Sequence, residues 1–232
     1  MGQPFIIWAA TRTASTTLSN ALNAETEPFN IGPPPNRLCW VYDLWRSTGS
    51  IRDIGRICES GLSIKHMVEG HDDGFNVALA KAATANGYRH IHLVRLDTLE
   101  RLISLDVAGQ VESWWPEQAR ERFAELANGE RTLNPLDVKR LVGNARIIAE
   151  RWRSVSRHLG CTLTITCEDI TSHARSRRIP ALRRITRFLE LPPAMLETLD
   201  AAMHRGDQDT RAIRSYVPNV GELRAAIHRE AA

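Results

Sequence analysis

The 232-residue sequence lacks several features that would assign it directly to a class of protein. It contains no G-x-x-x-x-G-K-[ST] motif, the phosphate-binding loop of many nucleotide-binding proteins. Its four cysteines show neither C-x-x-C pairing nor histidine partners at zinc spacing, so we expect reduced thiols and no metal site. No stretch approaches the roughly 20 apolar residues of a membrane span, and the sequence does not open with a basic, apolar leader. These absences predict a cytoplasmic protein without an integral membrane segment.

Charge and composition exclude further classes. The formal net charge of +3 is too small to indicate nucleic acid as a partner, although it is compatible with a locally basic pocket. A hydrophobic content of 43% and a charged content of 25% are typical of a globular protein, and there are no internal repeats. The length predicts a single domain over residues 1–232, with a helical insertion at about 110–158 and a basic loop at about 205–220.

The most informative stretch is the beginning of the chain. The apolar run Phe5–Ala10 predicts a strand buried on both faces, and helical spacing starts at Leu18. The turn between them offers the unpaired N–H groups and the positive dipole end of a helix start, while Arg12 adds a charge. This predicts an anion site. The other candidate ligands are the remaining residues of the turn and the first hydroxyls of the helix, Thr13, Ala14, Ser15, Thr16 and Thr17. The alternative is that Ser15 and Thr16 only cap the helix.

Further strands are predicted at residues 62–67, 88–95 and 161–167, with helical patterns between them. This alternation predicts an α/β fold of three layers, in which a central, mostly parallel sheet carries helices on both faces. Ligands of such sheets lie at the carboxyl ends of the strands. Lys65 and Arg95 end two of these strands, and Arg12 follows the first.

The second half of the chain is predicted to be mainly helical. The longest helical pattern runs from Asn134 to about Leu159, and Asp97 suits the N-cap of an earlier helix. The strict alternation of residues 161–167 indicates a strand at the edge of the sheet. Most of the arginines between 175 and 187 are predicted on the solvated face of a helix. Residues 207–219 show no helical or strand period.

Three features of the sequence resemble sulfotransferase motifs. Arg12-Thr-Ala-Ser-Thr-Thr-Leu18 resembles the 5′-phosphosulfate loop, a cation followed by a small residue and Ser/Thr-Thr. Arg95 at a strand end, with Ser104 in the next helix, resembles the 3′-phosphate motif, from which Leu96 and Asp97 depart. Glu27-Pro-Phe-Asn30 is similar to a phrase of carbohydrate sulfotransferases. The chain resembles bacterial carbohydrate sulfotransferases of the trehalose-sulfating type. The matching residues are few and are spread from residue 4 to about residue 223.

This resemblance implies a P-loop NTPase-like sulfotransferase fold. It implies 3′-phosphoadenosine 5′-phosphosulfate (PAPS) as donor, a hydroxyl of a carbohydrate or glycolipid as acceptor, and no metal. Glu27 would be the catalytic base and Lys65 would support the transferring group. The resemblance also makes Arg211 and Arg214, in the basic loop, candidate phosphate ligands. His66 is a further catalytic candidate, with His71 and Glu25 as rival bases.

Other interpretations remain open at this point. Glu27 could be a solvated carboxylate in a proline turn, Arg95 could form a surface ion pair, and the basic loop could be a flexible tail. His66 and His71 could both be surface residues. Two other functions are alternatives: a P-loop-like small-molecule kinase, or a regulatory nucleotide-binding module that has lost catalysis. We expect a small-molecule or glycolipid acceptor as partner, and a homodimer is a further alternative.

Overall fold

Four parallel strands form the centre of the molecule. The computed structural model describes residues 3–23, 50, 52–112, 116–205 and 212–231. Within them the strands are β1 (Phe5–Ala9), β2 (Ile64–Met67), β3 (Arg89–Val94) and β4 (Thr162–Thr166), in the order β2-β1-β3-β4. All three pairings are parallel, and β4 lies at an edge as predicted. The predicted α/β class is confirmed.

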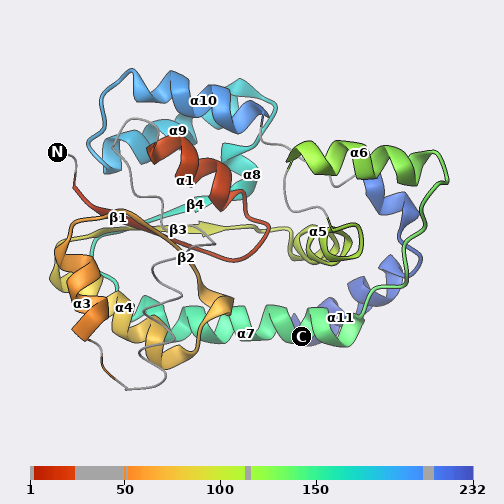
Figure 1. Cartoon of the computed structure of the whole chain (residues 1–232), viewed down its shortest axis with the longest axis horizontal. Coiled ribbons are helices and arrows are strands. Elements are labelled where there is room, and N and C mark those ends of the chain that lie inside the picture. Colours follow the sequence, from red (N-terminus) through yellow and green to blue (C-terminus); the bar gives the residue numbers. More distant parts are fainter. Residues whose placement is uncertain (1–2, 24–49, 51, 113–115, 206–211, 232) are drawn as a thin grey trace.

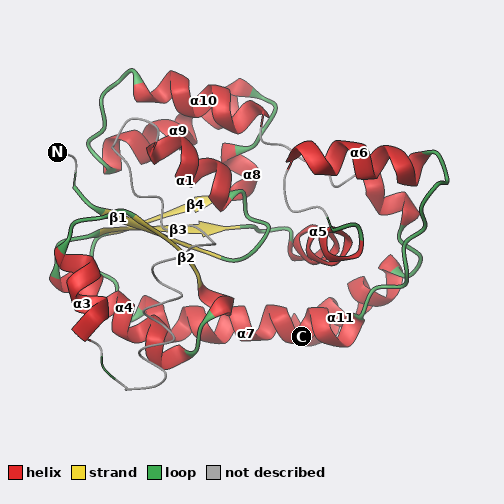
Figure 2. Cartoon of the chain, in the orientation of Figure 1, coloured by secondary structure: helices red, strands yellow, loops and turns green. Residues whose placement is uncertain are grey.

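Helices cover both faces of the sheet, which gives the three layers (Figures 1 and 2). One face carries α1 (Ser15–Asn23), α8 (Cys167–Ile170), α9 (Arg175–Phe188) and α10 (Met195–Arg205). The other face carries α3 (Arg52–Glu59), α4 (Asp73–Ala85) and the C-terminal part of α7 (Val138–Ser156). Helix α4 ends at Ala85, and Gly87 shortly after it adopts a φ of +72°, a conformation typical of a glycine that stops a helix.

The alternation of side chains along β1 builds a core on each side of the sheet. Phe5, Ile7 and Ala9 pack in the core that contains α1, α9 and α10. Ile6 and Trp8 pack in the core that contains α3, α4 and α7. Each of these five residues is at most 4% exposed. Burying a large apolar side chain stabilises a protein by about 1.5–3 kcal/mol, so this strand anchors both layers and fixes where the turn after it lies.

A third core lies beyond the carboxyl ends of the strands, among helices and the loops next to them, and contains no strand residue. It joins α5 (Thr98–Gln110), α6 (Pro116–Ala127), the N-terminal half of α7 and α11 (Val220–Ala231). Two short 3-10 helices, η1 (Val68–Gly70) and η2 (Ala212–Tyr216), complete the described elements. Figure 1 shows this helical group beside the sheet rather than on one of its faces.

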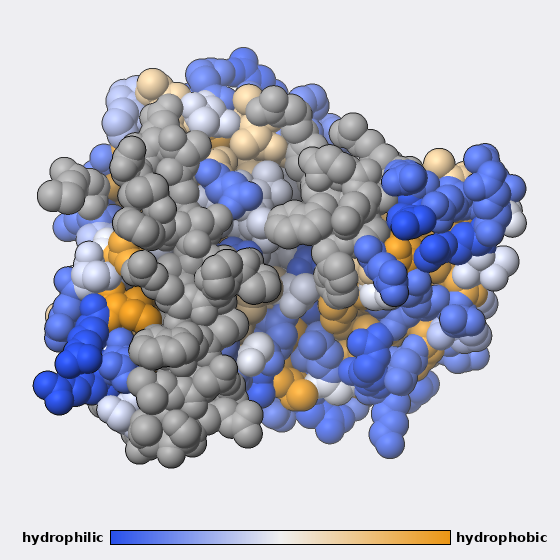
Figure 3. Space-filling model, viewed as in Figure 1, coloured by the Kyte–Doolittle hydropathy of each residue, from blue (hydrophilic) through white to orange (hydrophobic). Residues whose placement is uncertain are grey.

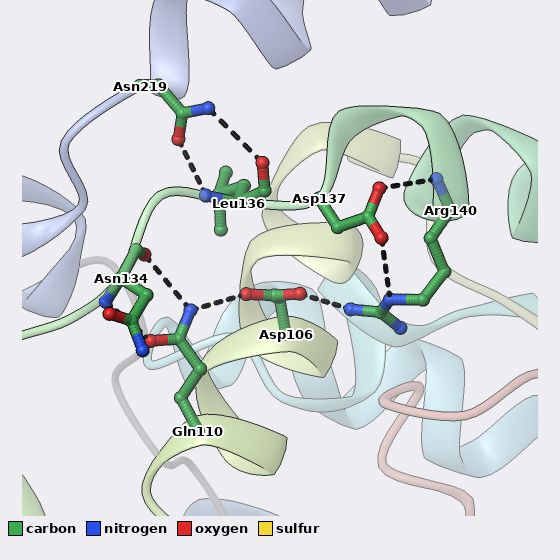
Figure 4. Close-up of polar contacts among 7 residues, drawn as sticks. All are labelled: Asp106, Gln110, Asn134, Leu136, Asp137, Arg140 and Asn219. Atoms are coloured by element: carbon green, nitrogen blue, oxygen red, sulfur yellow. Dashed lines mark hydrogen bonds and ion pairs between the residues drawn. The ribbon is translucent and has the colours of Figure 1, made fainter.

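Polar contacts tie the segment before α7 to α5 on one side and to Asn219, directly before α11, on the other (Figure 4). The buried carboxylate of Asp106 accepts hydrogen bonds from Gln110 Nε2 at 2.7 Å and from the guanidinium of Arg140. The side chain of Asn219 bonds both backbone groups of Leu136, accepting from the N–H at 2.7 Å and donating to the carbonyl at 3.2 Å. These bonds hold residues 134–137 in a non-helical conformation. Helix α7 therefore begins at Val138, with Asp137 as N-cap, and not at Asn134 as the sequence pattern suggested.

Of two sequence expectations about the C-terminal region, one is confirmed and the other is wrong in part. Most of the arginines between 175 and 187 are exposed, as predicted. Arg178 is the exception: it is 4% exposed and its Nε donates to Asp200 at 2.6 Å, so this arginine joins α9 to α10. Residues 212–216 form η2, where no regular structure was predicted, while 207–211 lie outside the described residues. In both cases a charged side chain has a buried partner from a distant segment, which local periodicity does not reveal.

In the view of Figure 3 the surface over α10 and over α6 is mostly hydrophilic, and apolar residues show in separate areas at the left of the molecule and below α6. None of the helices in the described ranges combines the length and the apolar composition that crossing a membrane requires.

Candidate functional site

The turn between β1 and α1 has an unusual backbone. Arg12 and Ala14 adopt φ values of +68° and +61°, in the left-handed region that non-glycine residues seldom occupy. Each such residue costs about 1–3 kcal/mol, and this kind of strain is concentrated at functional sites. The hydroxyl of Thr13 donates to the carbonyl of Ala10 at 2.7 Å and closes the turn. The sequence folds here into a tight, fixed loop without using glycine.

Helix α1 leaves its first N–H groups without an acceptor in the helix. Its first backbone bond joins Leu18 N to Ala14 O at 3.1 Å. The N–H groups of Ser15, Thr16 and Thr17 precede this bond and lie at the positive end of the helix dipole. Because Ala14 occupies the N-cap position, Ser15 and Thr16 do not act as the cap residue. The arrangement offers backbone donors to an anion.

Side chains from β2 and from η1 hold this turn from one side. Lys65 is 7% exposed, and its Nζ donates to Thr16 Oγ1 at 2.9 Å. Glu69 Oε1 accepts hydrogen bonds from both the N–H and the hydroxyl of Thr11. Arg151 of α7 donates to the carbonyl of Val68 at 3.1 Å and fixes the short helix that carries Glu69. The carboxyl end of β2 is thus bonded directly to the turn after β1.

Side chains from β3 and α5 hold the turn from the other side. Arg95 directly follows β3, and its Nη1 donates to the carbonyl oxygen of Arg12 at 3.1 Å. The Nε of Arg12 donates to the hydroxyl of Ser104, a residue of α5 that is 1% exposed, at 2.8 Å. The structure therefore brings together Arg12, Lys65, Arg95 and Ser104, which the sequence placed at separate strand ends and in a helix.

Positive charge in this site exceeds negative charge among the described residues. Burial, and then the charge of Arg95, lower the pKa of Arg12 to about 10. Burial lowers the pKa of Lys65. Burial also lowers the pKa of Arg101, with a further contribution from Arg95 that Glu69 opposes. Four cations thus share the neighbourhood of a carboxylate that is already bonded to Thr11. A bound anion would stabilise the charged form of each of them.

A pocket of about 230 Å³ adjoins the turn on the face of the sheet covered by α7. Ala10 and Thr13 of the turn, Arg95, and Arg101 of α5 contribute to its lining. Its other walls are mainly apolar or aromatic and come from β1, β3 and α7, including Trp8, His92, Ala145, Ile148 and Trp152. His92 stacks on Trp152 with ring centroids 3.3 Å apart, and burial lowers the pKa of this histidine to about 4. The pocket is therefore apolar with cations at the edge next to the turn.

His66 is not brought to this site. Successive residues of a strand point to opposite faces, so Lys65 reaches α1 while His66 packs against α4. His66 is 1% exposed and its Nε2 lies 2.6 Å from Asn76 Oδ1. The Nδ2 of Asn76 donates to the carbonyl of Val68, so Nε2 of His66 is the donor in this pair. The neighbouring His71 stacks on His66 and is also buried, so neither histidine is a surface residue.

The remaining predicted site residues are placed as follows. Glu27, its rival Glu25, and Arg211 lie outside the described residues. Arg214 lies in η2, where its Nη1 donates to Glu100 Oε1 at 2.8 Å. Glu100 belongs to the first turn of α5 and is 1% exposed. Arg214 is thus bonded to a buried carboxylate near the site rather than to the turn itself.

Two site residues were missed by the sequence reasoning. Arg101 is 5% exposed and its Nη2 donates to Asn144 Oδ1 at 3.1 Å, whereas charged residues in an amphipathic helix are normally assigned to solvent. Its position one turn before Ser104 could have shown that both share a face. Glu69 follows the second strand closely, so the rule that strand ends carry functional residues could have identified it.

Comparison with protein-family models, with curated proteins and with solved structures finds no match to this chain. The function is therefore argued from the chemistry of the site.

Proposed function

We propose that this protein is a sulfotransferase that binds PAPS at the turn after β1 and moves its sulfuryl group to an acceptor hydroxyl. The observation that carries the proposal is the convergence of Arg12, Lys65 and Arg95 from three strand ends on one turn. Such an excess of cations beside free helix N–H groups suits a ligand with several anionic groups. The likeness of the turn to a phosphosulfate loop supports a sulfuryl donor over other anions.

Each group has a role that follows from its position. Arg12 and the N–H groups of Ser15–Thr17 would hold the 5′-phosphosulfate. Lys65, next to Thr16, would stabilise the oxygens whose charge rises during transfer. Arg95 and Ser104 lie farther along the sheet edge and would contact the 3′-phosphate, although both are also bonded to Arg12. Catalysis would consist mainly of positioning and of positive charge, as in phosphoryl transfer.

The proposed reaction needs a base for the acceptor. The acceptor oxygen forms a bond to sulfur while the bond from sulfur to the 5′-phosphate oxygen breaks. The hydroxyl proton passes to a carboxylate, and adenosine 3′,5′-bisphosphate leaves. Glu27 remains the residue expected to take this proton, and a carbohydrate or glycolipid hydroxyl remains the acceptor that the resemblance implies.

Calorimetric titration tests the donor. We expect adenosine 3′,5′-bisphosphate to bind more tightly than ADP or ATP, because losing a charge-assisted hydrogen bond costs about 1.5–3 kcal/mol. Arg95→Met should remove this preference. Arg187→Met, which changes an exposed arginine at the end of α9, is the matched control and should leave it unchanged. Equal affinity for ADP and the bisphosphate would overturn the donor assignment.

A turnover assay separates the rival functions. Release of the bisphosphate from PAPS in the presence of a panel of sugars, glycolipids and phenols supports the transferase. Tight bisphosphate binding without transfer to any acceptor would indicate the regulatory module. Hydrolysis or transfer from ATP, with no preference for a 3′-phosphate, would indicate the kinase.

A further inference from the structure

The pocket beside the turn lies on the opposite side of the sheet from α1. Trp8, Ile148 and Trp152, which line the pocket, pack in the core of α4 and α7, whereas α1 packs in the core on the other face of the sheet. Ala9 and Leu93 of that other core reach the pocket only where β1 and β3 end. The free N–H groups of α1 are therefore on one side of the turn and the pocket is on the other. A nucleotide held by α1 would leave the pocket open to a second ligand.

The charges around the pocket favour an anion. Arg95 and Arg101 contribute to its lining, and no aspartate or glutamate does so among the described residues. Arg101 is 5% exposed and is oriented by its bond to Asn144, and its Nη1 has no hydrogen-bond partner within the described part of the chain. A buried guanidinium with an unused donor is costly unless an anion or acceptor reaches it. The described lining residues thus offer two cations and no carboxylate to a ligand.

The other walls of the pocket favour an apolar body. The indole N–H of Trp8 is already bonded to His90 Nδ1 at 3.0 Å, so Trp8 offers only apolar surface to the pocket. His92 and Trp152 form a stacked aromatic pair, and the small side chains of Ala145 and Ala149 leave room in front of α7. A free sugar would leave many of its hydroxyls without partners against these walls, which is unfavourable. A flat or compact apolar group has no such hydroxyls and can contact these walls without losing hydrogen bonds.

We propose that this pocket is the acceptor subsite and that it takes a small amphipathic anion, a ring-sized apolar body that carries a hydroxyl and one carboxylate or similar anionic group. The apolar body lies between Trp8, Trp152 and Ile148, and the anionic group contacts Arg101 and Arg95. This inference rests on the proposed function, and it replaces the carbohydrate acceptor, which only the sequence resemblance implies, with a hydroxylated apolar acid. The volume of about 230 Å³ is small for a ligand pocket and suits a single ring.

The binding test uses 4-hydroxybenzoate as the probe and 4-hydroxybenzyl alcohol as its uncharged counterpart. Calorimetry on the full chain is done with and without saturating adenosine 3′,5′-bisphosphate. We expect the acid to bind at least about tenfold more tightly than the alcohol, because only the acid pairs with the arginines. We expect its binding to persist with the bisphosphate present, since the two ligands lie on opposite sides of the turn.

A pair of adjacent residues in α7 provides the variants. Ile148 lines the pocket, whereas Ile147 is 42% exposed and does not line it. Ile148→Trp should abolish binding of the acid and leave bisphosphate affinity unchanged, and Ile147→Trp should change neither. Ala145→Leu fills the same pocket and serves if Ile148→Trp lowers the melting temperature. A sulfated product, detected by mass spectrometry with PAPS and 4-hydroxybenzoate, would support the acceptor role directly.

Several outcomes would overturn the inference. Equal affinity for the acid and the alcohol excludes the anion contact. Competition between the acid and the bisphosphate, or loss of bisphosphate binding in Ile148→Trp, assigns the pocket to the nucleotide base instead. Simultaneous binding without sulfated product removes the acceptor role. If 4-hydroxybenzoate binds and the bisphosphate does not, the proposed function and the acceptor role are both wrong. The proposal that the pocket binds a small amphipathic anion is then still supported.

Discussion

Arg95 donates from Nη1 to the backbone carbonyl of Arg12 at 3.1 Å, so one arginine holds the main chain of another. This contact keeps Arg12 in its left-handed conformation and places two positive charges side by side in a partly buried site. Like charges in such a place destabilise the free protein, and a bound anion offsets that cost. The site is therefore expected to be more stable with its ligand than without it.

Replacement of Arg12 by alanine and by lysine shows how much of the bisphosphate affinity depends on the charge of this residue and how much on the shape of its guanidinium group. Arg12→Ala should weaken bisphosphate binding tenfold or more, because it removes a charge-assisted contact worth about 1.5–3 kcal/mol. Arg12→Lys should recover only part of the affinity, since lysine keeps the charge but lacks the planar fork whose Nε bonds Ser104. Calorimetry measures both affinities. Ser104→Ala removes the same hydrogen bond without changing charge, and, although it also removes the proposed 3′-phosphate contact of Ser104, it should weaken binding less than Arg12→Ala does. Full affinity in Arg12→Ala would exclude the turn as the phosphate site.

Replacement of Lys65 should weaken bisphosphate binding without lowering the stability of the free protein. Burial lowers the pKa of this amine, so the charged form of Lys65 is less favourable in the folded protein than in water. Lys65→Met removes the buried charge at similar length, and we expect the melting temperature of the free protein to stay the same or rise. The same variant should lose most of the stabilisation by bisphosphate, which for wild type is about 2.7 kcal/mol at a ligand concentration of 100 times Kd. A lower melting temperature with an intact ligand shift would make Lys65 purely structural.

The sequence predicted the parts of the site that depend on local pattern. The strand Phe5–Ala9 could be predicted because an uninterrupted apolar run fits a strand buried on both faces. Arg12, Lys65 and Arg95 could be predicted because parallel strands bring their carboxyl ends to one edge. Asp97 was correctly predicted as an N-cap, and it accepts a hydrogen bond from Glu100 N.

The parts that could not be predicted depend on partners far away in the chain. Arg101 and Arg178 are buried because Asn144 and Asp200 bond them, and a pattern that assigns charged residues to solvent cannot show this. His66 sits at a strand end beside Lys65 but points to the opposite face, where Asn76 bonds it. Predicting the strand correctly did not show which face of the sheet His66 would occupy, because that depends on the helices that cover each face.

Buried histidines should make the protein sensitive to acid. Burial, with a smaller contribution from His71, lowers the pKa of His66 to about 3, and burial lowers that of His90 to about 4. An unfolded histidine titrates near 6.5. Above that pH neither state is protonated. As the pH falls from about 6.5 towards 4, the unfolded state takes up protons that the folded state does not, so stability falls.

The variant His66→Gln tests this dependence. Glutamine can still donate to Asn76 Oδ1 but does not titrate. Between pH 6 and pH 4.5 the free energy of unfolding should fall less steeply than in wild type, by about 1.4 kcal/mol per pH unit for the one lost proton. Urea unfolding at a series of pH values measures the slope. His228→Gln, at an exposed position in α11, is the control that should leave the slope unchanged. An unaltered slope in His66→Gln would mean that His66 titrates normally in the folded protein.

The ion pair between Arg214 and Glu100 should be structural. Glu100 is almost fully buried, its Oε1 accepts from Arg214, and its Oε2 has no hydrogen-bond partner among the residues that the structure describes. Arg214→Ala would leave a buried carboxylate with neither oxygen paired, so we expect a loss of stability of about 1–3 kcal/mol. The double variant Arg214→Ala with Glu100→Gln should regain part of that loss, because the uncompensated charge is gone. Bisphosphate affinity, measured well below the melting temperature, should be unchanged in both. A tenfold loss of affinity in Arg214→Ala, with stability kept, would instead show that Arg214 leaves Glu100 to bind the phosphate that the sequence resemblance assigned to it.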